Sequence, residues 1–205
     1  MTDRFAGSNL TCIRGGRLVF KDLAFALGKG EALVLRGPNG TGKSSLLRLM
    51  AGLGVPADGT ITWNGESITD DPPAHAERMH YLGHKNALKS ALTARENLTF
   101  WADLHGTEAA VDDALEAFDI SRLADLPARL LSSGETRRLA LARLIANKTP
   151  LWLLDEPTVG LDQTSVERLA DLVSRHRTRG GMVIISIHGP FPLESSRTLD
   201  LGTRS

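Results

Sequence analysis

The segment Gly37-Pro38-Asn39-Gly40-Thr41-Gly42-Lys43-Ser44 decides the fold of this 205-residue chain. It matches the phosphate-loop pattern G-x-x-x-x-G-K-[ST], in which glycines allow backbone amides to curl around a polyphosphate. The preceding run 31–36 is predicted to be a strand, and 43–51 a helix closed by Gly52. Because a helix N-terminus favours anions, this strand–loop–helix unit predicts a nucleotide site. The residues expected to bind the nucleotide here are Gly37, Pro38, Asn39, Gly40, Thr41, Gly42, Lys43, Ser44 and Ser45.

Two adjacent carboxylates follow the apolar run 151–154. This run lacks polar alternation, which is typical of a strand covered on both faces in a parallel sheet. We expect Asp155, with the Ser44 hydroxyl, to hold Mg²⁺, and Glu156 to act as general base on the attacking water. Lys43 is expected to reach the β- and γ-phosphates. The alternative is a strand that merely exits into a polar turn, and the phosphate loop favours the catalytic interpretation.

A second feature, Leu131-Ser132-Ser133-Gly134-Glu135, is called the signature segment below. One interpretation is purely structural, because Ser132 and Glu135 form the capping-box pattern of a helix start. The other is a second anion-binding helix end, about 90 residues after the first. One nucleotide rarely needs two such ends from one small domain. If both bind phosphate, the second serves a nucleotide on another subunit.

The phosphate loop, the signature segment, the 151–156 strand, the segment 159–162 and His188 occur in the order and approximate spacing of ABC-type ATPases. The chain resembles this family over nearly its whole length. The resemblance implies a head-to-tail homodimer that holds two ATP molecules between the phosphate loop of one copy and the signature segment of the other. It also implies that Asp162 lies at that interface and that His188 contacts the γ-phosphate. The residues expected to bind ATP from the signature segment are Ser132, Ser133, Gly134 and Glu135, of which Ser133 and Glu135 depart from the common L-S-G-G-Q.

At two further positions the chain differs from the common pattern of this family, and these differences indicate a subfamily. His84 stands where the family usually has a glutamine, and Arg14 stands near the position of the aromatic that stacks on adenine, so a guanidinium is expected to stack there instead. With a short tail after His188, these features resemble the haem-exporter ATP-binding subunits of cytochrome c maturation. The family docks its transmembrane subunits near 87–92, although Leu88 and Leu92 could equally pack within the helical part.

The fold class expected from the elements and the resemblance is α/β, a P-loop NTPase of ABC-ATPase type. It would have a mostly parallel core sheet, an N-terminal antiparallel β lobe and a helical insert. We expect one ATP-binding domain over 1–205, with its nucleotide core in about 1–83 and 132–205 and its helical subdomain in about 84–131. Further predicted strands are 17–20, 23–27, 60–63 and 182–187, and Asn64-Gly65 predicts a tight turn after the 60–63 strand.

We expect mainly helical structure from 93 to 126. There Thr93 with Glu96 is a capping box, and Leu98, Trp101, Ala102 and His105 follow at helical spacing. Further helices are predicted from Ser133 to about Asn147 and over 162–177. The three tryptophans, Trp63, Trp101 and Trp152, are expected to be core residues.

Composition limits the partners. Lys plus Arg and Asp plus Glu both number 24, so no global field indicates nucleic acid. A single cysteine, Cys12, suits a reducing compartment. The N-terminus lacks the apolar core of a signal peptide, and no apolar run approaches the ~20 residues that span a bilayer. We therefore expect a peripheral protein on the cytoplasmic face of the bacterial inner membrane, whose transmembrane ABC subunits are separate chains.

Four other functions compete with this interpretation. A GTPase would need an Asp where Pro150 stands in Asn147-Lys148-Thr149-Pro150, so it is discarded. A small-molecule kinase would leave the signature segment and His188 unexplained. An ATPase of another small ABC exporter, or a non-transport ABC ATPase, stays open, although the single cassette, short insert and lack of a basic cluster favour transport.

Overall fold

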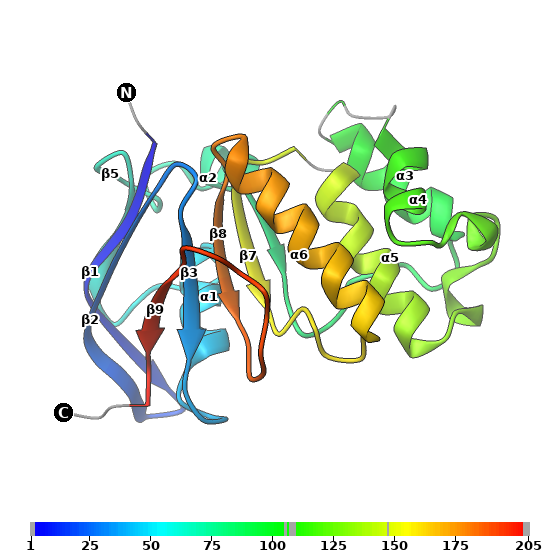
Figure 1. Ribbon diagram of the computed structural model, residues 1–205. Helices are drawn as coiled ribbons and strands as arrows, with labels where there is room; N and C mark the ends of the chain where they lie inside the picture. The colour runs from blue at the N-terminus through cyan, green and yellow to red at the C-terminus, as the bar shows by residue number, and fades with distance from the viewer. Residues whose placement is uncertain (1–2, 105, 107–109, 147, 203–205) are drawn as a thin grey trace. The chain divides into compact units, whose positions relative to one another are not determined.

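The computed structural model describes residues 3–104, 106, 110–146 and 148–202. They form two compact units (Figure 1). Unit 1 comprises Met1–Tyr81, Thr149–Glu156 and Val173–Ser205, and unit 2 comprises Leu82–Lys148 and Pro157–Leu172. The division of the sequence into a nucleotide core and a helical subdomain stays a prediction.

Unit 1 contains an antiparallel sheet near the N-terminus. Its four strands have the order β2-β1-β4-β5. Their bounds are β1 Arg4–Arg14, β2 Arg17–Gly28, β4 Asp58–Trp63 and β5 Glu66–Ser67. The Asn64-Gly65 pair has positive φ at both residues and joins β4 to β5, which confirms the predicted tight turn.

The second sheet has the order β6-β7-β8-β3-β9. Strand β3 pairs in parallel with β8 and β9, and β7 pairs in parallel with β8 (Figure 1). The strands are β3 Ala32–Arg36, β6 Met79–Leu82, β7 Leu151–Asp155, β8 Met182–Ser186 and β9 Arg197–Asp200. Every residue of β7 and β8 is buried, as expected of central parallel strands.

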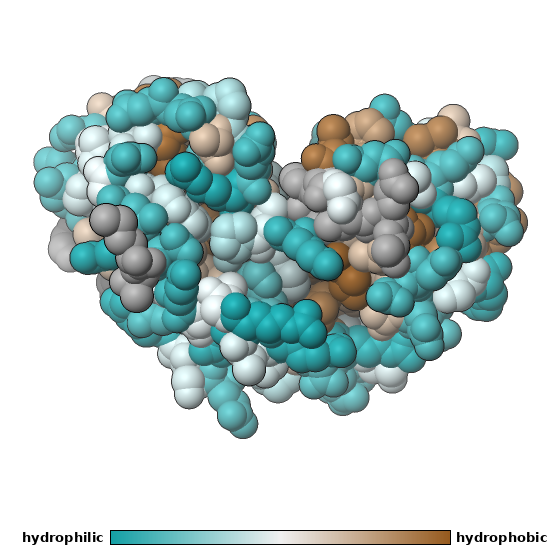
Figure 2. Space-filling model, turned by 90° about the horizontal axis from the view of Figure 1, so that it is seen from above, coloured by the Kyte–Doolittle hydropathy of each residue, from teal (hydrophilic) through white to brown (hydrophobic). Residues whose placement is uncertain are grey.

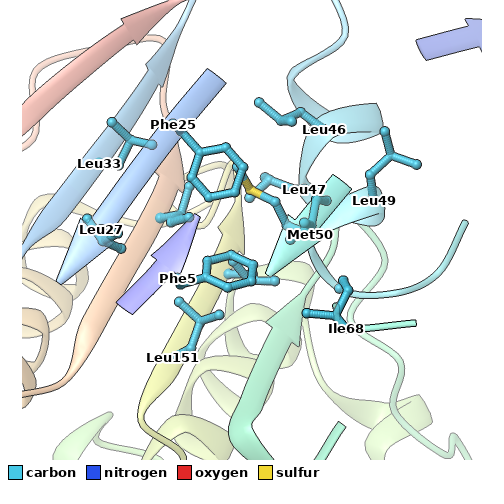
Figure 3. Packing of buried hydrophobic residues seen from close by; sticks show 14 of the residues in the cluster. Phe5, Phe25, Leu27, Leu33, Leu46, Leu47, Leu49, Met50, Ile68 and Leu151 are labelled. Carbon is cyan, nitrogen blue, oxygen red and sulfur yellow. The ribbon is translucent and has the colours of Figure 1, made fainter. Parts of the chain in front are cut away.

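The main core of unit 1 lies between these sheets and helix α1, Lys43–Met50. Figure 3 shows Phe5 and Phe25 of the antiparallel sheet beside Leu47 and Met50 of α1. The ring centroids of Phe5 and Phe25 are 5.4 Å apart. Because α1 packs its apolar face here, its N-terminus is fixed at the end of β3, and this placement positions the phosphate loop.

Unit 2 is mainly helical. It contains α3 Ala94–Leu104, α4 Val111–Ala117 and α5 Ser133–Ala146, with short 3₁₀ turns at Ser121–Leu123 and Ala128–Leu130. Helix α6, Gln163–Thr178, contributes residues to both units. The predicted capping box at the start of α3 is confirmed, since Thr93 N donates to Glu96 Oε2 (2.7 Å) and Glu96 N to Thr93 Oγ1 (3.1 Å). His105 and Asn147 lie outside the described residues.

Several elements differ from the sequence prediction. The two short strands predicted over 17–27 are one strand, β2, and its partner β1 was not predicted. Strand β1 contains Gly7-Ser8-Asn9, a turn-like composition; its register shifts there, and Asn9 has φ of 52°. Helix α2, Pro72–Arg78, was not predicted; its two prolines occupy the first turn behind an Asp71 cap.

Two of the three tryptophans are confirmed as core residues. Trp63 and Trp152 are buried, whereas Trp101 is only partly buried. Within the described residues, no helix has both the length and the apolar character needed to cross a membrane.

Candidate functional site

The phosphate loop of unit 1 connects β3 to α1 through a backbone that needs glycine. Gly37, Gly40 and Gly42 all have positive φ, at 136°, 82° and 105°. A Cβ at Gly42 would lie 2.5 Å from Val19 Cγ1, so a larger residue would also clash with β2. No side chain caps the start of α1 in the described chain, which leaves its first amides oriented for an anion.

Lys43 is the first residue of α1 and is 5% exposed. Its Nζ donates to the carbonyls of Gly37 (2.7 Å) and Pro38 (3.0 Å), so the ammonium lies inside the curve of the loop. Thr41 Oγ1 donates to the same Pro38 carbonyl (3.0 Å). The charge is therefore held by neutral acceptors that a phosphate could replace. Ser44 is exposed and Ser45 partly buried at the helix start.

Asp155 and Glu156 lie where β7 ends. Asp155 is 2% exposed, and its Oδ1 accepts a hydrogen bond from Ser186 Oγ (2.8 Å). Glu156 N donates to the same hydroxyl (2.9 Å). Glu156 has φ of 47°, a left-handed conformation that is uncommon for a non-glycine residue. Ser186, the last residue of β8, therefore organises both carboxylate residues, and sequence reasoning missed it. A polar residue ending a buried apolar strand was the available signal.

His188 follows Ser186 by two residues and contacts Glu156 directly. Its Nε2 lies 2.8 Å from Glu156 Oε1, and the two side chains are 42% and 24% exposed. The structure thus brings the candidate base and the candidate γ-phosphate ligand together within unit 1. The pair can orient the carboxylate for proton abstraction from a water.

Arg14 ends β1 in unit 1 and is exposed. Its Nη2 lies 3.5 Å from the position that a Cβ on Gly54 would occupy, so its guanidinium reaches the segment after α1. Stacking of Arg14 on adenine stays a prediction.

The signature segment in unit 2 forms the capping box that its sequence predicts. Ser132 N donates to Glu135 Oε2 (3.0 Å), and Glu135 N donates to Ser132 Oγ (3.3 Å). Hydrogen bonds from Ser132, with the nearby Arg122 guanidinium, lower the pKa of Glu135. The structural interpretation is therefore confirmed. The ATP-binding roles of Ser132, Ser133, Gly134 and Glu135 stay a prediction.

Asp162 lies close to the same end of unit 2 in the chain segment 157–172. Its Oδ1 accepts from Ser165 N (2.8 Å), so it caps α6, and hydrogen bonds from the side chain and the backbone of Ser165 lower its pKa. A Cβ on Gly134 would lie 3.5 Å from the Gly160 carbonyl oxygen. The start of α5 and the segment before Asp162 are therefore in close contact.

His84 is exposed on the segment that follows β6. The same segment is fixed further along by Asn97, which is 3% exposed. Asn97 Oδ1 accepts from Lys89 N (2.8 Å), and its Nδ2 donates to the carbonyls of Lys89 (3.0 Å) and Leu92 (3.2 Å). Leu88 and Leu92 are both partly buried, and docking of transmembrane subunits at 87–92 stays a prediction.

Comparison with known proteins identifies the class. The sequence profile of the ABC transporter family matches residues 20–159. A solved structure described as an ATP-binding subunit of an ABC transporter superimposes with a TM-score of 0.83 at 25% identity, covering 90% of this chain and 79% of that one. A putative ABC transporter ATP-binding protein from Pyrococcus furiosus shares the fold, with a TM-score of 0.84, 24% identity and 97% of both chains covered. The chain belongs to the ABC transporter family and is an ATP-binding ATPase of that family.

Curated relatives narrow the assignment. The chain is 52% identical over 202 residues to the cytochrome c biogenesis ATP-binding export protein CcmA of Paramagnetospirillum magneticum, covering 96% of this chain and 93% of that protein. It is 53% identical over 198 residues to CcmA of Rhodospirillum rubrum, covering 96% and 85%. Its similarity is therefore to the CcmA-type branch, as the positions of His84 and Arg14 led us to expect.

Proposed function

We propose that two copies of this chain hydrolyse ATP jointly and thereby drive a CcmA-type exporter of cytochrome c biogenesis. The observation that supports this most directly is that unit 1 carries an uncapped phosphate loop around Lys43 and a Glu156–His188 pair, and that unit 2 carries a second helix start at 132–135. Each copy thus carries one complete phosphate-binding end and one further helix end. A partner copy could complete the nucleotide site.

In this proposal ATP binds with Mg²⁺. Among the described residues, no group of three or more His, Cys, Asp or Glu side chains could hold a metal ion alone. That agrees with Mg²⁺ chemistry, because this ion commonly keeps several waters and takes substrate phosphates as ligands. Ser44 would bind it directly and Asp155 through water, and the ion would neutralise phosphate charge.

The hydrolytic steps follow from side-chain chemistry. Lys43 would leave the carbonyls of Gly37 and Pro38 for the β- and γ-phosphates. Glu156 would accept a proton from the attacking water, and His188 would hold Glu156 in orientation and donate to the γ-phosphate. Closure of the dimer on ATP and its release after hydrolysis would move the membrane subunits.

The membrane partners are proposed to be separate transmembrane ABC subunits, with this chain on the cytoplasmic face of the bacterial inner membrane. The resemblance to haem-exporter ATP-binding subunits makes haem transport the proposed activity of the whole complex. Most of the surface drawn in Figure 2 is hydrophilic, and smaller areas of it are hydrophobic. The helical unit exposes several large apolar side chains that a partner could cover, namely Phe100, Leu104, Leu126, Leu130 and Val159.

The test is purification of the chain with whatever it binds in membranes. We expect hydrophobic membrane proteins to co-purify and the complex to hydrolyse Mg-ATP, with loss of turnover in the matched Lys43→Ala complex. Recovery of ribosomes or DNA instead would favour a non-transport ABC ATPase. A complex that binds the membrane proteins but shows no ATP hydrolysis above the Lys43→Ala background would contradict the proposal.

A further inference from the structure

One buried side chain in unit 2 connects three separate segments of the chain. Arg137, in the second turn of α5, is 5% exposed. Its Nε donates to the Pro157 carbonyl (3.2 Å), and its Nη1 donates to the Gly83 carbonyl (3.3 Å) and to Asn86 Oδ1 (2.9 Å). The planar guanidinium can serve acceptors in several directions at fixed angles, which an ammonium cannot.

Each acceptor of Arg137 is next in sequence, or nearly so, to a candidate site residue. Gly83 and Asn86 flank His84, and Pro157 directly follows Glu156. Arg137 itself lies only two residues beyond the signature segment. Within unit 2 the side chain therefore connects α5 to the 83–86 segment and to Pro157, each next to a candidate site residue.

A second buried arginine of α5 holds the same loop. Arg143 is 3% exposed, donates from Nη1 to the Asn86 carbonyl (3.0 Å), and lies 4.0 Å over the ring of Trp101. Burial lowers the pKa of Arg143 to about 10, which still leaves it charged at neutral pH. Asn86 is thus bound through both its side chain and its main chain.

Stability alone does not explain such an arrangement. Replacing buried charges with well-packed apolar residues is often neutral or stabilising, because a buried charge carries a large desolvation penalty. Arg137 nonetheless donates hydrogen bonds to neutral oxygens of Gly83, Asn86 and Pro157, which lie on two irregular segments. The hydrogen bonds from the Arg137 guanidinium therefore give those segments a defined geometry.

The backbone at Glu156 shows why this geometry matters. Its φ of 47° must be maintained by the surroundings. On its amino side, Glu156 N is held by Ser186 Oγ (2.9 Å). On its carboxyl side, the next carbonyl, that of Pro157, is held by Arg137. Both bonds therefore constrain the backbone on either side of Glu156.

We propose that Arg137 is a positioning residue for ATP hydrolysis, which acts by holding the backbone after Glu156 and the His84 segment against the start of α5. The inference rests on the proposed function, in which Glu156 is the general base. Arg137 then affects the hydrolytic step and has little effect on ATP binding.

The experiment uses the complete complex with its membrane partners and compares wild type with Arg137→Met. A small displacement of a catalytic group can cost about 10²-fold in rate, so we expect kcat to fall by about 10- to 100-fold. KM for ATP should stay within about twofold, the pattern of a lost transition-state interaction. Under turnover, Arg137→Met should accumulate an ATP-bound dimer, as we also expect of Glu156→Gln. A merely structural role would instead reduce the dimer together with thermal stability.

Two controls define the result. Arg138→Met removes the neighbouring arginine, which donates to the Phe118 carbonyl (3.4 Å), and should keep kcat within about twofold. If Arg137→Met does not fold, two substitutions of Asn86 test the same hydrogen bond. Asn86→Asp keeps the Oδ1 acceptor and should retain kcat. Asn86→Leu removes the acceptor and should lower kcat severalfold.

The inference is overturned if Arg137→Met hydrolyses ATP at the wild-type rate, or if it loses dimer and stability without trapping ATP. Equal kcat in the two Asn86 variants would overturn it as well. An inactive wild-type complex is a different outcome, because it would refute the proposed function and, with it, this inference.

Discussion

The two helix ends of the candidate site satisfy their backbone donors in opposite ways. At the phosphate loop, no side chain caps α1 in the described chain, and Lys43 is held by carbonyls of the loop. At the signature segment, Ser132 and Glu135 satisfy each other, and a carboxylate already lies over the helix start. The first end is arranged to receive an anion. At the second end, Ser132 and Glu135 already satisfy the first backbone donors of the helix. Its contribution to ATP affinity should therefore be smaller and should depend on dimer closure.

Removal of the candidate base, Glu156, should have the largest effect on ATP hydrolysis. Glu156→Gln keeps the size of the side chain and loses its basicity, and general-base catalysis contributes about 10²- to 10⁴-fold. We expect steady-state hydrolysis to fall by that order while ATP binding persists. Phosphate release and nucleotide binding measured on one preparation separate the two effects. Unchanged steady-state turnover would exclude Glu156 as the base.

Lys43→Ala tests the affinity assigned to the phosphate loop. The substitution removes the only cation described inside the loop, so ATP affinity should fall by about tenfold or more together with turnover. Titration with a fluorescent ATP analogue measures the loss, with Lys29→Ala, a surface lysine paired with Asp3, as the matched control. Undiminished binding in Lys43→Ala would count against the loop assignment.

Ser132→Arg tests the claim that the second end acts only after closure. The bulky cation should block dimer formation, yet leave ATP binding to the monomer within about twofold, because Ser132 is remote in sequence from the loop that binds ATP. A mixed dimer that pairs Ser132→Arg with Lys43→Ala should retain at most one competent site. Full activity of that mixed dimer would show that the signature segment does not contribute to the shared site.

Glu135→Gln should have a smaller effect. Because hydrogen bonds from Ser132 lower the pKa of Glu135, its carboxylate is charged at neutral pH. Glutamine preserves the capping box and removes this negative charge from the helix end that would face a triphosphate. We expect KM for ATP to fall by about two- to fivefold with unfolding temperature little changed. Glu135→Ala, which also loses the cap, should instead lower the unfolding temperature.

Lowering the pH should reduce the stability of the two units over different pH ranges. In unit 1, burial lowers the pKa of His176 to about 4, and its ring stacks 3.7 Å from Trp152. The unfolded histidine, at pKa 6.5, binds its proton first, so the free energy of unfolding should fall on the order of 1–3 kcal/mol between pH 6.5 and 4. In unit 2 the stabilisation from Glu135 is present above its unfolded pKa of about 4.5, and it is lost as pH falls through the lower folded-state pKa.

Urea unfolding of wild type and His176→Phe across this range measures the difference. We expect the wild type to lose more stability than His176→Phe between pH 6.5 and 4. Parallel pH dependences of the two proteins would show that His176 does not carry this effect.

Local sequence patterns predicted the parts of the fold whose physics is local. The phosphate loop, the β4–β5 turn and both capping boxes depend on residues a few positions apart, and each formed as expected. Strand β1 did not follow from its own composition, because its bulged middle is stabilised by pairing on both sides with β2 and β4. Ser186 and Arg137 act through partners 20 to 54 residues away, which one sequence cannot bring together.

The central claim is that one triphosphate is held by two copies of this chain, each offering a different helix end. The direct measurement is the mass in solution of Glu156→Gln with Mg-ATP, alone and with the membrane subunits, compared with the same protein carrying Ser132→Arg. We expect two copies of this chain per particle with Mg-ATP, and one copy when Ser132→Arg is present. A Glu156→Gln protein that binds ATP and stays a single copy, even with its membrane subunits present, would contradict it.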